Sequence, residues 1–149
     1  MSKSYKIRLS LFLTLILMLA FSMTGFAAPD YISADDVGSG GWLTITNPDK
    51  TYSTTYNSSY SIAGVTDDGA TVYVYKSNGN GGYTRLTDYS QTVGASGWFV
   101  IPVKLNMGRN AFLIRSELGG ASKDGTFEIN LLSSSMYNLV KNFKGGLLK

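Results

Sequence analysis

The chain has 149 residues with no cysteine and no histidine, and its 13 Lys and Arg against 10 Asp and Glu give a formal net charge of +3. Without those two residue types, thiol catalysis and Ser-His-Asp catalysis are excluded, and a structural zinc site is disfavoured. Three of the cations lie within the first eight residues, so the rest of the chain is neutral and lacks the basic stripe that a nucleic-acid partner requires. We therefore expect a non-catalytic protein with no metal, no cofactor and no nucleic-acid partner.

Residues 1–27 have the three parts of a secretory signal peptide. A basic end is followed by an almost unbroken apolar run over residues 9–21, and Gly25 and Ala27 then supply small residues, so cleavage is predicted after Ala27. The alternative is a retained membrane anchor, which is disfavoured because the apolar run is shorter than the roughly 18–20 residues of a spanning helix. We expect the mature chain to be secreted or held at the cell envelope.

The mature chain of about 120 residues suffices for one domain. Residues 28–41 are polar and rich in glycine, which predicts a flexible lead-in. Residues 42–132 contain seven short runs rich in Val, Ile, Tyr, Thr and Phe, separated by turn residues at the spacing typical of an all-β sandwich. The predicted fold is all-β, a seven-stranded antiparallel immunoglobulin-like β-sandwich.

Alternation within the runs predicts which side chains form the core. The runs are residues 42–46, 59–65, 70–75, 83–93, 98–105, 110–115 and 126–131. The predicted core side chains are Ile62, Val72, Val74, Phe99, Ile101, Val103, Phe112, Ile114, Phe127 and Ile129. Pro102 cannot donate a ladder hydrogen bond, so the fifth run is expected at a sheet edge or at a bulge. The fourth run is weak and polar and is also expected at an edge.

Turn chemistry predicts the local roles of three further residues. An Asp-Gly pair ending at Gly69 indicates a tight hairpin between the second and third runs, bracketed by Gly64 and Gly69. Asn110 follows a turn and can bond the loop backbone through its side-chain amide.

Two segments resemble the two halves of bacterial immunoglobulin-like domains. In the first half, residues 61–66 end a strand at a glycine, and residues 69–74 follow with the "Gly-Ala-x-Val" pattern of that family. In the second half, residues 97–99 bear a Phe and lead into residues 103–110, which contain "Leu-x-x-Gly-x-Asn". The resemblance spans residues 42–131 and implies a spacer, an adhesive unit or an accessory to a carbohydrate-active enzyme. Our leading hypothesis is a non-catalytic exported module of the cell envelope that acts in binding or adhesion.

Three aromatic residues suggest an alternative function. Tyr73, Tyr75 and Trp98 fall on outward positions of the third and fifth runs, where their rings could stack on sugars in a carbohydrate-binding accessory module. The simpler interpretation is that Tyr is common on half-buried sheet faces. The expected partner is cell-wall polysaccharide or an envelope protein.

The acidic residues suggest a second type of site. Asp67, Asp68 and Asp124 could bind calcium only if two loops met, because calcium needs several converging oxygen ligands. The turn before Gly69 explains Asp67 and Asp68 more simply.

Residues 133–149 are predicted to form a short amphipathic tail. Its apolar stripe at helical spacing consists of Met136, Leu139, Val140, Phe143 and Leu147. Lys141 and Lys144 flank the stripe, and Ser134 or Ser135 can cap the start of the helix. Such a segment can dock on an anionic membrane face or on a partner, and the alternative is a frayed terminus.

Overall fold

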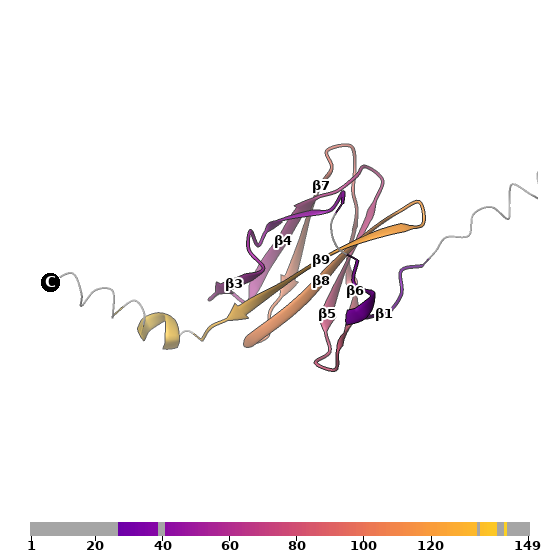
Figure 1. The fold of residues 1–149 in the computed structure, drawn as a ribbon. Helices are drawn as coiled ribbons and strands as arrows, with labels where there is room; N and C mark the ends of the chain where they lie inside the picture. The colour runs from indigo at the N-terminus through magenta and orange to yellow at the C-terminus, as the bar shows by residue number, and fades with distance from the viewer. Residues whose placement is uncertain (1–26, 39–40, 134, 140–141, 143–149) are drawn as a thin grey trace, which may run out of the picture.

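A computed structural model of the chain describes residues 27–38, 41–133, 135–139 and 142. Within these residues there are nine β-strands, one 3-10 turn and a short α-helix over residues 135–139, and the strands form two packed sheets (Figure 1). The elements are β1 (Tyr31–Ser33), η1 (Ala34–Asp36), β2 (Thr44–Asn47), β3 (Tyr52–Thr55), β4 (Ser59–Val65), β5 (Thr71–Ser77), β6 (Gly82–Thr92), β7 (Trp98–Lys104), β8 (Gly108–Leu118) and β9 (Ala121–Leu131). The predicted all-β sandwich is confirmed, with nine strands in place of seven.

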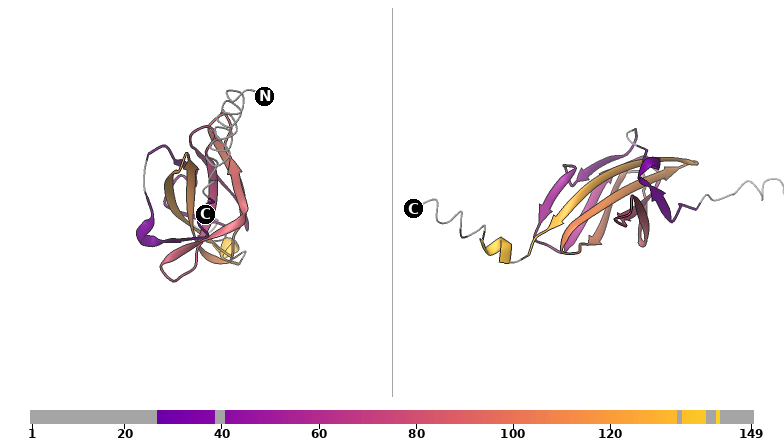
Figure 2. Two further views of the ribbon diagram at one scale, coloured as in Figure 1. Left: turned by 90° about the vertical axis from the view of Figure 1, so that its right-hand side faces the viewer. Right: turned by 60° about the horizontal axis from the view of Figure 1, so that its bottom comes forward.

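The strands divide into a large sheet of order β1-β6-β5-β8-β9-β3 and a small sheet of order β2-β4-β7 (Figure 2). All neighbours are antiparallel except β3 and β9, which run parallel from the pair Tyr52 and Glu128 to the pair Thr55 and Leu131. The residues of β3 are mostly polar, so their pattern does not predict a strand. The entirely antiparallel arrangement is therefore wrong at this edge of the large sheet.

The predicted hairpin at Gly69 is also wrong, because β4 and β5 belong to different sheets. Each strand buries its apolar face against the other sheet, so the turn carries the chain across the sandwich. The tight hairpin joins β8 and β9 instead, where Leu118 pairs with Ala121. The two residues between them, Gly119 and Gly120, have φ of 58° and 84°, and positive φ at both positions is what a type I′ turn requires.

The main core lies between the two sheets and contains every core side chain that the alternation predicts. All ten are buried, and the most exposed of them, Phe127, is only 6% exposed. The rings of Phe112 and Phe127 pack with centroids 5.8 Å apart. The predicted core is thus confirmed.

The expected flexible lead-in is instead part of the fold. β1 pairs with the start of β6, from Tyr31 opposite Thr84 to Ser33 opposite Gly82. Ile32 is buried on the outer face of the large sheet with Tyr75 and Leu113, and these three form a second, smaller core. The polar and glycine-rich composition of this segment does not predict that it pairs with the sheet. Its one buried member of the second core is Ile32, and a single apolar residue leaves no pattern in the sequence.

Candidate functional site

The three aromatic residues predicted to form one sugar-binding platform do not lie together. Tyr73 and Tyr75 are on β5 in the large sheet, whereas Trp98 is on β7 in the small sheet. Tyr75 is fully buried, and its hydroxyl donates to the carbonyl oxygen of Pro29 at 2.8 Å. Tyr73 is half-buried, with the guanidinium carbon of Arg85 4.5 Å from its ring centroid. The shared platform is therefore wrong, because the N-terminal segment covers this face of β5.

Trp98 is exposed as predicted and belongs to an apolar strip. Trp98, Val100 and Pro102 alternate along β7 with their side chains exposed, and Trp98 and Val100 are 54% and 55% exposed. Their cross-strand partners on β4 include the half-buried Val65 and Ala63. We call these five side chains the β7 face.

The β7 face lies in a sheet that is almost free of charge. Lys104, at the end of β7, is the one charged residue in β2, β4 and β7. β7 is at the edge of the small sheet, as Pro102 predicted. Two of its backbone amides donate to side chains: Trp98 N donates to Ser96 Oγ at 3.4 Å, and Val100 N donates to Gln91 Oε1 on β6 at 3.0 Å. Because these two amides are occupied and Pro102 has no N–H, few backbone groups at this edge are free to pair with an added strand. A partner would therefore contact the exposed side chains of β7.

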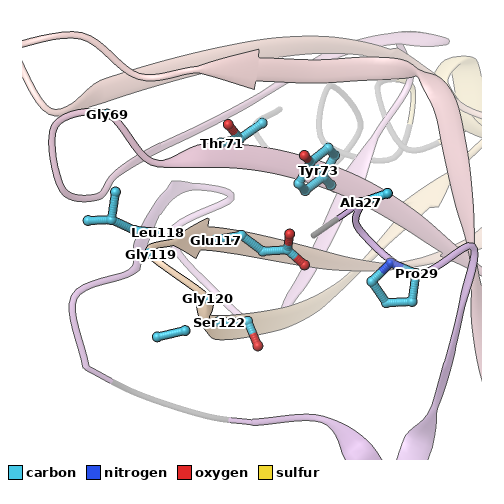
Figure 3. A pocket seen from close by; sticks show the side chains of 11 residues that line it. Ala27, Pro29, Gly69, Thr71, Tyr73, Glu117, Leu118, Gly119, Gly120 and Ser122 are labelled. Carbon is cyan, nitrogen blue, oxygen red and sulfur yellow. The ribbon is translucent and has the colours of Figure 1, made fainter. Parts of the chain in front are cut away.

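The outer face of the large sheet has a different character. An open hollow of about 620 Å³ lies there, and its lining includes Ala27, Pro29, Thr71, Tyr73 and Glu117 (Figure 3). We call it the N-terminal hollow. Burial raises the pKa of Glu117, and the positive charges of Arg115 and Arg85 oppose this effect in part.

Next to the hollow, an ion pair crosses from β8 to β9. Arg115 Nε donates to Asp124 Oδ1 and Arg115 Nη2 to Asp124 Oδ2, both at 2.7 Å. Gly38 N also donates to Asp124 Oδ2, at 2.9 Å, so this carboxylate ties the N-terminal segment to the large sheet. Asp124 is thereby engaged, while Asp67 and Asp68 are exposed, and no group of three acidic residues converges within the described part of the chain.

Asn110 makes the backbone contacts that its position predicts. Its side-chain nitrogen donates to the carbonyl oxygens of Asn106 and Gly108 at 2.7 and 2.9 Å. Its side-chain oxygen accepts from Asn106 N and from Lys76 Nζ, both at 2.9 Å. Burial lowers the pKa of Lys76. The fully buried Asn110 therefore holds the turn before β8 and is structural in this position.

The tail begins with a short helix over residues 135–139. Ser133 caps it: its Oγ accepts from Met136 N at 3.2 Å, one residue before the predicted cap at Ser134 or Ser135. Met136 and Leu139 are exposed. The Tyr137 ring packs edge to face on Tyr56 with centroids 4.8 Å apart. Four members of the predicted docking stretch lie outside the described residues: Val140, Lys141, Phe143 and Lys144.

Comparison of the sequence with models of protein families finds no match, and neither does comparison with curated proteins. In the described part of the chain, no helix has both the length and the apolar character needed to cross a membrane.

The N-terminal hollow and its carboxylate, Glu117, are absent from the predictions made from the sequence. A signal was available, because Tyr75 and Leu113 are large apolar residues at outward positions of two strands. Side chains of that kind on both faces of a strand indicate that both faces are covered. The cover, however, comes from Ile32, some forty residues earlier in the chain than Tyr75, so spacing alone could not identify it.

Proposed function

We propose that this chain is an exported, non-catalytic immunoglobulin-like module of the cell envelope that binds a protein partner through the β7 face. Export rests on the signal-peptide pattern of residues 1–27. The buried Ala28 supports cleavage after Ala27, because cleavage one residue later would remove a side chain that packs in the fold.

The order of the strands supports the immunoglobulin-like assignment. β4 and β7 lie side by side in one sheet, as strands B and E do in that fold, while β5, β8 and β9 are neighbours in the other, as are C, F and G. β6 lies beside β5, in the place that variable-type domains give to strand C′. The resemblance of residues 42–131 to bacterial immunoglobulin-like domains is consistent with this order.

The observation that carries the binding proposal is the β7 face itself. An exposed apolar strip with a Trp at one end is the kind of surface that protein interfaces bury, since Trp is enriched among the residues that contribute most to binding. Only Lys104 carries charge on the three strands, so few ions would have to be desolvated on contact.

Carbohydrate binding is the second candidate, and Trp98 favours it, because an exposed indole can stack on a sugar ring. The neighbours of Trp98 favour protein instead. Val100 and Pro102 offer no side-chain hydrogen bond to sugar hydroxyls, whereas an apolar protein surface needs none. The polar groups that a sugar could use lie to either side of them, at Ser61 on β4 and at Asp88 and Ser90 on β6.

The test compares the mature wild-type protein with a Trp98→Ala/Val100→Thr double variant, using the amounts retained from envelope protein extract and from protein-free cell-wall polysaccharide. Met107→Thr is the matched control, since Met107 is an apolar residue, 66% exposed, outside the β7 face. We expect the wild type and Met107→Thr to retain the same envelope protein, and the double variant to lose it at least tenfold.

Two outcomes would contradict the proposal. Wild-type retention on polysaccharide that the double variant loses would favour the carbohydrate candidate. Equal retention of the envelope protein by all three forms would mean that the β7 face is not the binding site.

A further inference from the structure

The chain just after the predicted cleavage point is held by three consecutive carbonyl oxygens. Ala28 O accepts from Arg85 Nη1 at 3.2 Å, and Pro29 O accepts from the Tyr75 hydroxyl at 2.8 Å. Asp30 O accepts from the backbone N of Arg85 at 2.9 Å. These three hydrogen bonds restrict the position of the backbone nitrogen of Ala28, because Ala28, Pro29 and Asp30 cannot move away from the sheet without breaking them.

The peptide bond between Ala27 and Ala28 therefore lies at the wall of the N-terminal hollow. Ala27 and Pro29, on either side of Ala28, both line it. Figure 3 shows the Glu117 carboxylate pointing along the hollow toward the end where Ala27 and Pro29 lie. Cleavage of this bond would leave the new chain terminus at the end of the hollow toward which that carboxylate points.

Glu117 has no partner of its own in the described part of the chain, where no hydrogen bond or ion pair to its side chain occurs. Neither nearby cation bonds Glu117: Arg115 pairs with Asp124, and Arg85 stacks on Tyr73 and holds the carbonyl oxygen of Ala28. The Nε of Arg85 has no hydrogen-bond partner among the described residues, and the charges of both arginines lower the pKa of Glu117. Burial raises the pKa of Glu117, which means that its charged form is poorly compensated where it stands.

We propose that the N-terminal hollow is a binding site for the α-ammonium group of the mature chain, which begins at Ala28 and forms an ion pair with Glu117. The proposal rests on the proposed export, because a signal peptidase makes the cut. Hydrolysis adds the hydroxyl of one water to the Ala27 carbonyl and its proton to the Ala28 nitrogen. The new amine takes up a second proton at neutral pH, since the pKa of an α-amino group is about 8.

Removal of the leader thus changes the electrostatics of the fold. Before cleavage, the nitrogen of Ala28 is a neutral amide, and Glu117 is a half-buried carboxylate whose charge Arg115 and Arg85 compensate only in part. After cleavage, a positive charge lies beside Glu117 and also near Arg85, which holds the Ala28 carbonyl oxygen, so the ion pair requires that attraction to Glu117 exceeds repulsion from Arg85. The mature chain is then more stable than the same chain with its leader attached.

The experiment compares three proteins that begin at Ala28, Ala27 and Thr24, each released from a fusion that leaves no extra residue, and each with Glu117 or with Glu117→Gln. With Glu117 present, we expect the protein that begins at Ala28 to melt at a Tm roughly 3–6 °C above the two longer ones. In Glu117→Gln, the three termini should melt within about 1 °C of one another. Glu117 is not fully buried and Gln has the same size, so this variant keeps the fold.

The pH dependence gives an independent measurement. The charged and phenolic groups around Glu117 are Arg85, Arg115, Asp124, Tyr73 and Tyr75, and all six proteins share them. An ammonium whose pKa is raised by Glu117 stabilises the fold fully below its unfolded pKa of about 8 and no longer does so once the pH passes its folded pKa. The Tm advantage of the Ala28 terminus should therefore disappear between pH 8 and about pH 10.

An equal Tm advantage in Glu117→Gln would mean that the longer termini act by crowding, and the proposal would be wrong. Equal Tm values with Glu117 present would also overturn it. These proteins are made without export, so either result leaves the proposed localisation standing. Conversely, an exported protein whose mass shows another first residue would overturn this proposal while leaving export intact.

Discussion

Gly64 lies where β4 passes under the ring of Phe99 at the centre of the main core. A Cβ at this position would lie 2.5 Å from Phe99 Cζ and 2.5 Å from the carbonyl oxygen of Thr44 on β2. One contact is with a side chain and the other with backbone, so the two neighbouring strands can come this close only if no side chain is present. The glycine serves close packing between strands and not the hairpin that the sequence analysis assigned to it.

Gly64→Ala should lower the free energy of unfolding by about 1–3 kcal/mol, the usual cost of overpacking a core. Gly94→Ala is the matched control, because a Cβ at Gly94 meets nothing within 4 Å. That control should change the free energy by less than about 0.5 kcal/mol. Urea titration of both variants measures the difference, and equal stabilities would contradict the packing argument.

The buried phenol of Tyr75 should make the stability of the protein sensitive to alkali. Burial, and to a lesser degree the charge of Glu117, raises the pKa of Tyr75 from the ordinary tyrosine value of 10.0 to about 12. Between these values the unfolded chain loses the phenolic proton while the folded chain keeps it. The unfolded state then binds fewer protons, so the free energy of unfolding falls as the pH rises from 10 to 12.

Tyr75→Phe should cost about 1 kcal/mol at pH 7, because the hydrogen bond to the Pro29 carbonyl is lost. From pH 10 to 12, however, the free energy of unfolding of this variant should fall less steeply than that of the wild type. Urea titrations at several pH values measure both slopes. Identical slopes would show that Tyr75 is not the phenol responsible.

At the scale of elements, the N-terminal segment behaves as an integral layer on the large sheet. β1 pairs with β6, Ile32 covers Tyr75, and Gly38 donates to the carboxylate of Asp124. The Arg115–Asp124 pair therefore stabilises more than the β8–β9 hairpin that contains it. Its side chains are 11% and 1% exposed, so removing one partner leaves the other charge desolvated.

Asp124→Ala should destabilise the protein by about 3–5 kcal/mol, because Arg115 is then left without its counter-ion. Glu128→Ala is the control on the same hairpin: its partner Arg109 is 76% exposed, so water can solvate the remaining charge. Loss of that pair should cost less than about 1 kcal/mol. Thermal unfolding of both variants gives the comparison, and similar losses would mean that burial does not set the value of these pairs.

The C-terminal tail is the second element whose contacts lead to a testable prediction. Its helix at 135–139 contacts the sandwich through Tyr137, while Met136 and Leu139 are exposed. This arrangement leaves part of the predicted stripe available for docking. A helix of about ten residues is too short to be stable alone in water, so docking should increase its helix content.

We predict that the full mature protein binds anionic liposomes more tightly than a form ending at Ser134, because the cations of the tail favour an anionic surface. Added salt should weaken the binding, since exposed charges are screened over roughly 10 Å at 0.1 M. Co-sedimentation with the vesicles measures both effects. If the two forms bind equally, the tail does not dock on membranes.

At the scale of the whole molecule, the two outer faces differ in chemistry. The small sheet presents the β7 face with a single charge, Lys104, whereas the large sheet carries Glu117 and the Arg115–Asp124 pair under its N-terminal segment. One face thus has the properties of a contact surface, and the other contains the hollow proposed to hold the start of the mature chain. The N-terminal proposal requires cleavage after Ala27, whereas the contact surface on the small sheet does not.

The exported protein should therefore begin at Ala28. Mass spectrometry of the protein from the medium or the envelope fraction measures its first residue directly. A mature chain that began at Pro29 would lose the Ala28 carbonyl that Arg85 holds. An intact Met1 on a membrane-bound product would overturn the predicted localisation.

The sequence by itself determined the main core and the edge position of β7. Alternation has a period of two residues and depends only on neighbours along the chain, so it placed Ile62, Val74 and Phe99 inside without any knowledge of which strands pair. Pro102 likewise indicated an edge strand by itself, because a missing N–H is a property of one residue.

Only the tertiary structure decided which strands are neighbours and which outward faces are covered. Alternation along a strand indicates which side chains share a face, but it does not indicate which sheet the strand joins. The turn at Gly69 therefore resembles a hairpin in the sequence although it connects the two sheets, and the polar strand β3 shows no alternation at all. Tyr75 has the correct parity and is nevertheless buried, because Ile32 reaches it from a distant part of the chain. Contacts of this kind depend on the closure of long loops and on the total area buried, and no local pattern records either quantity.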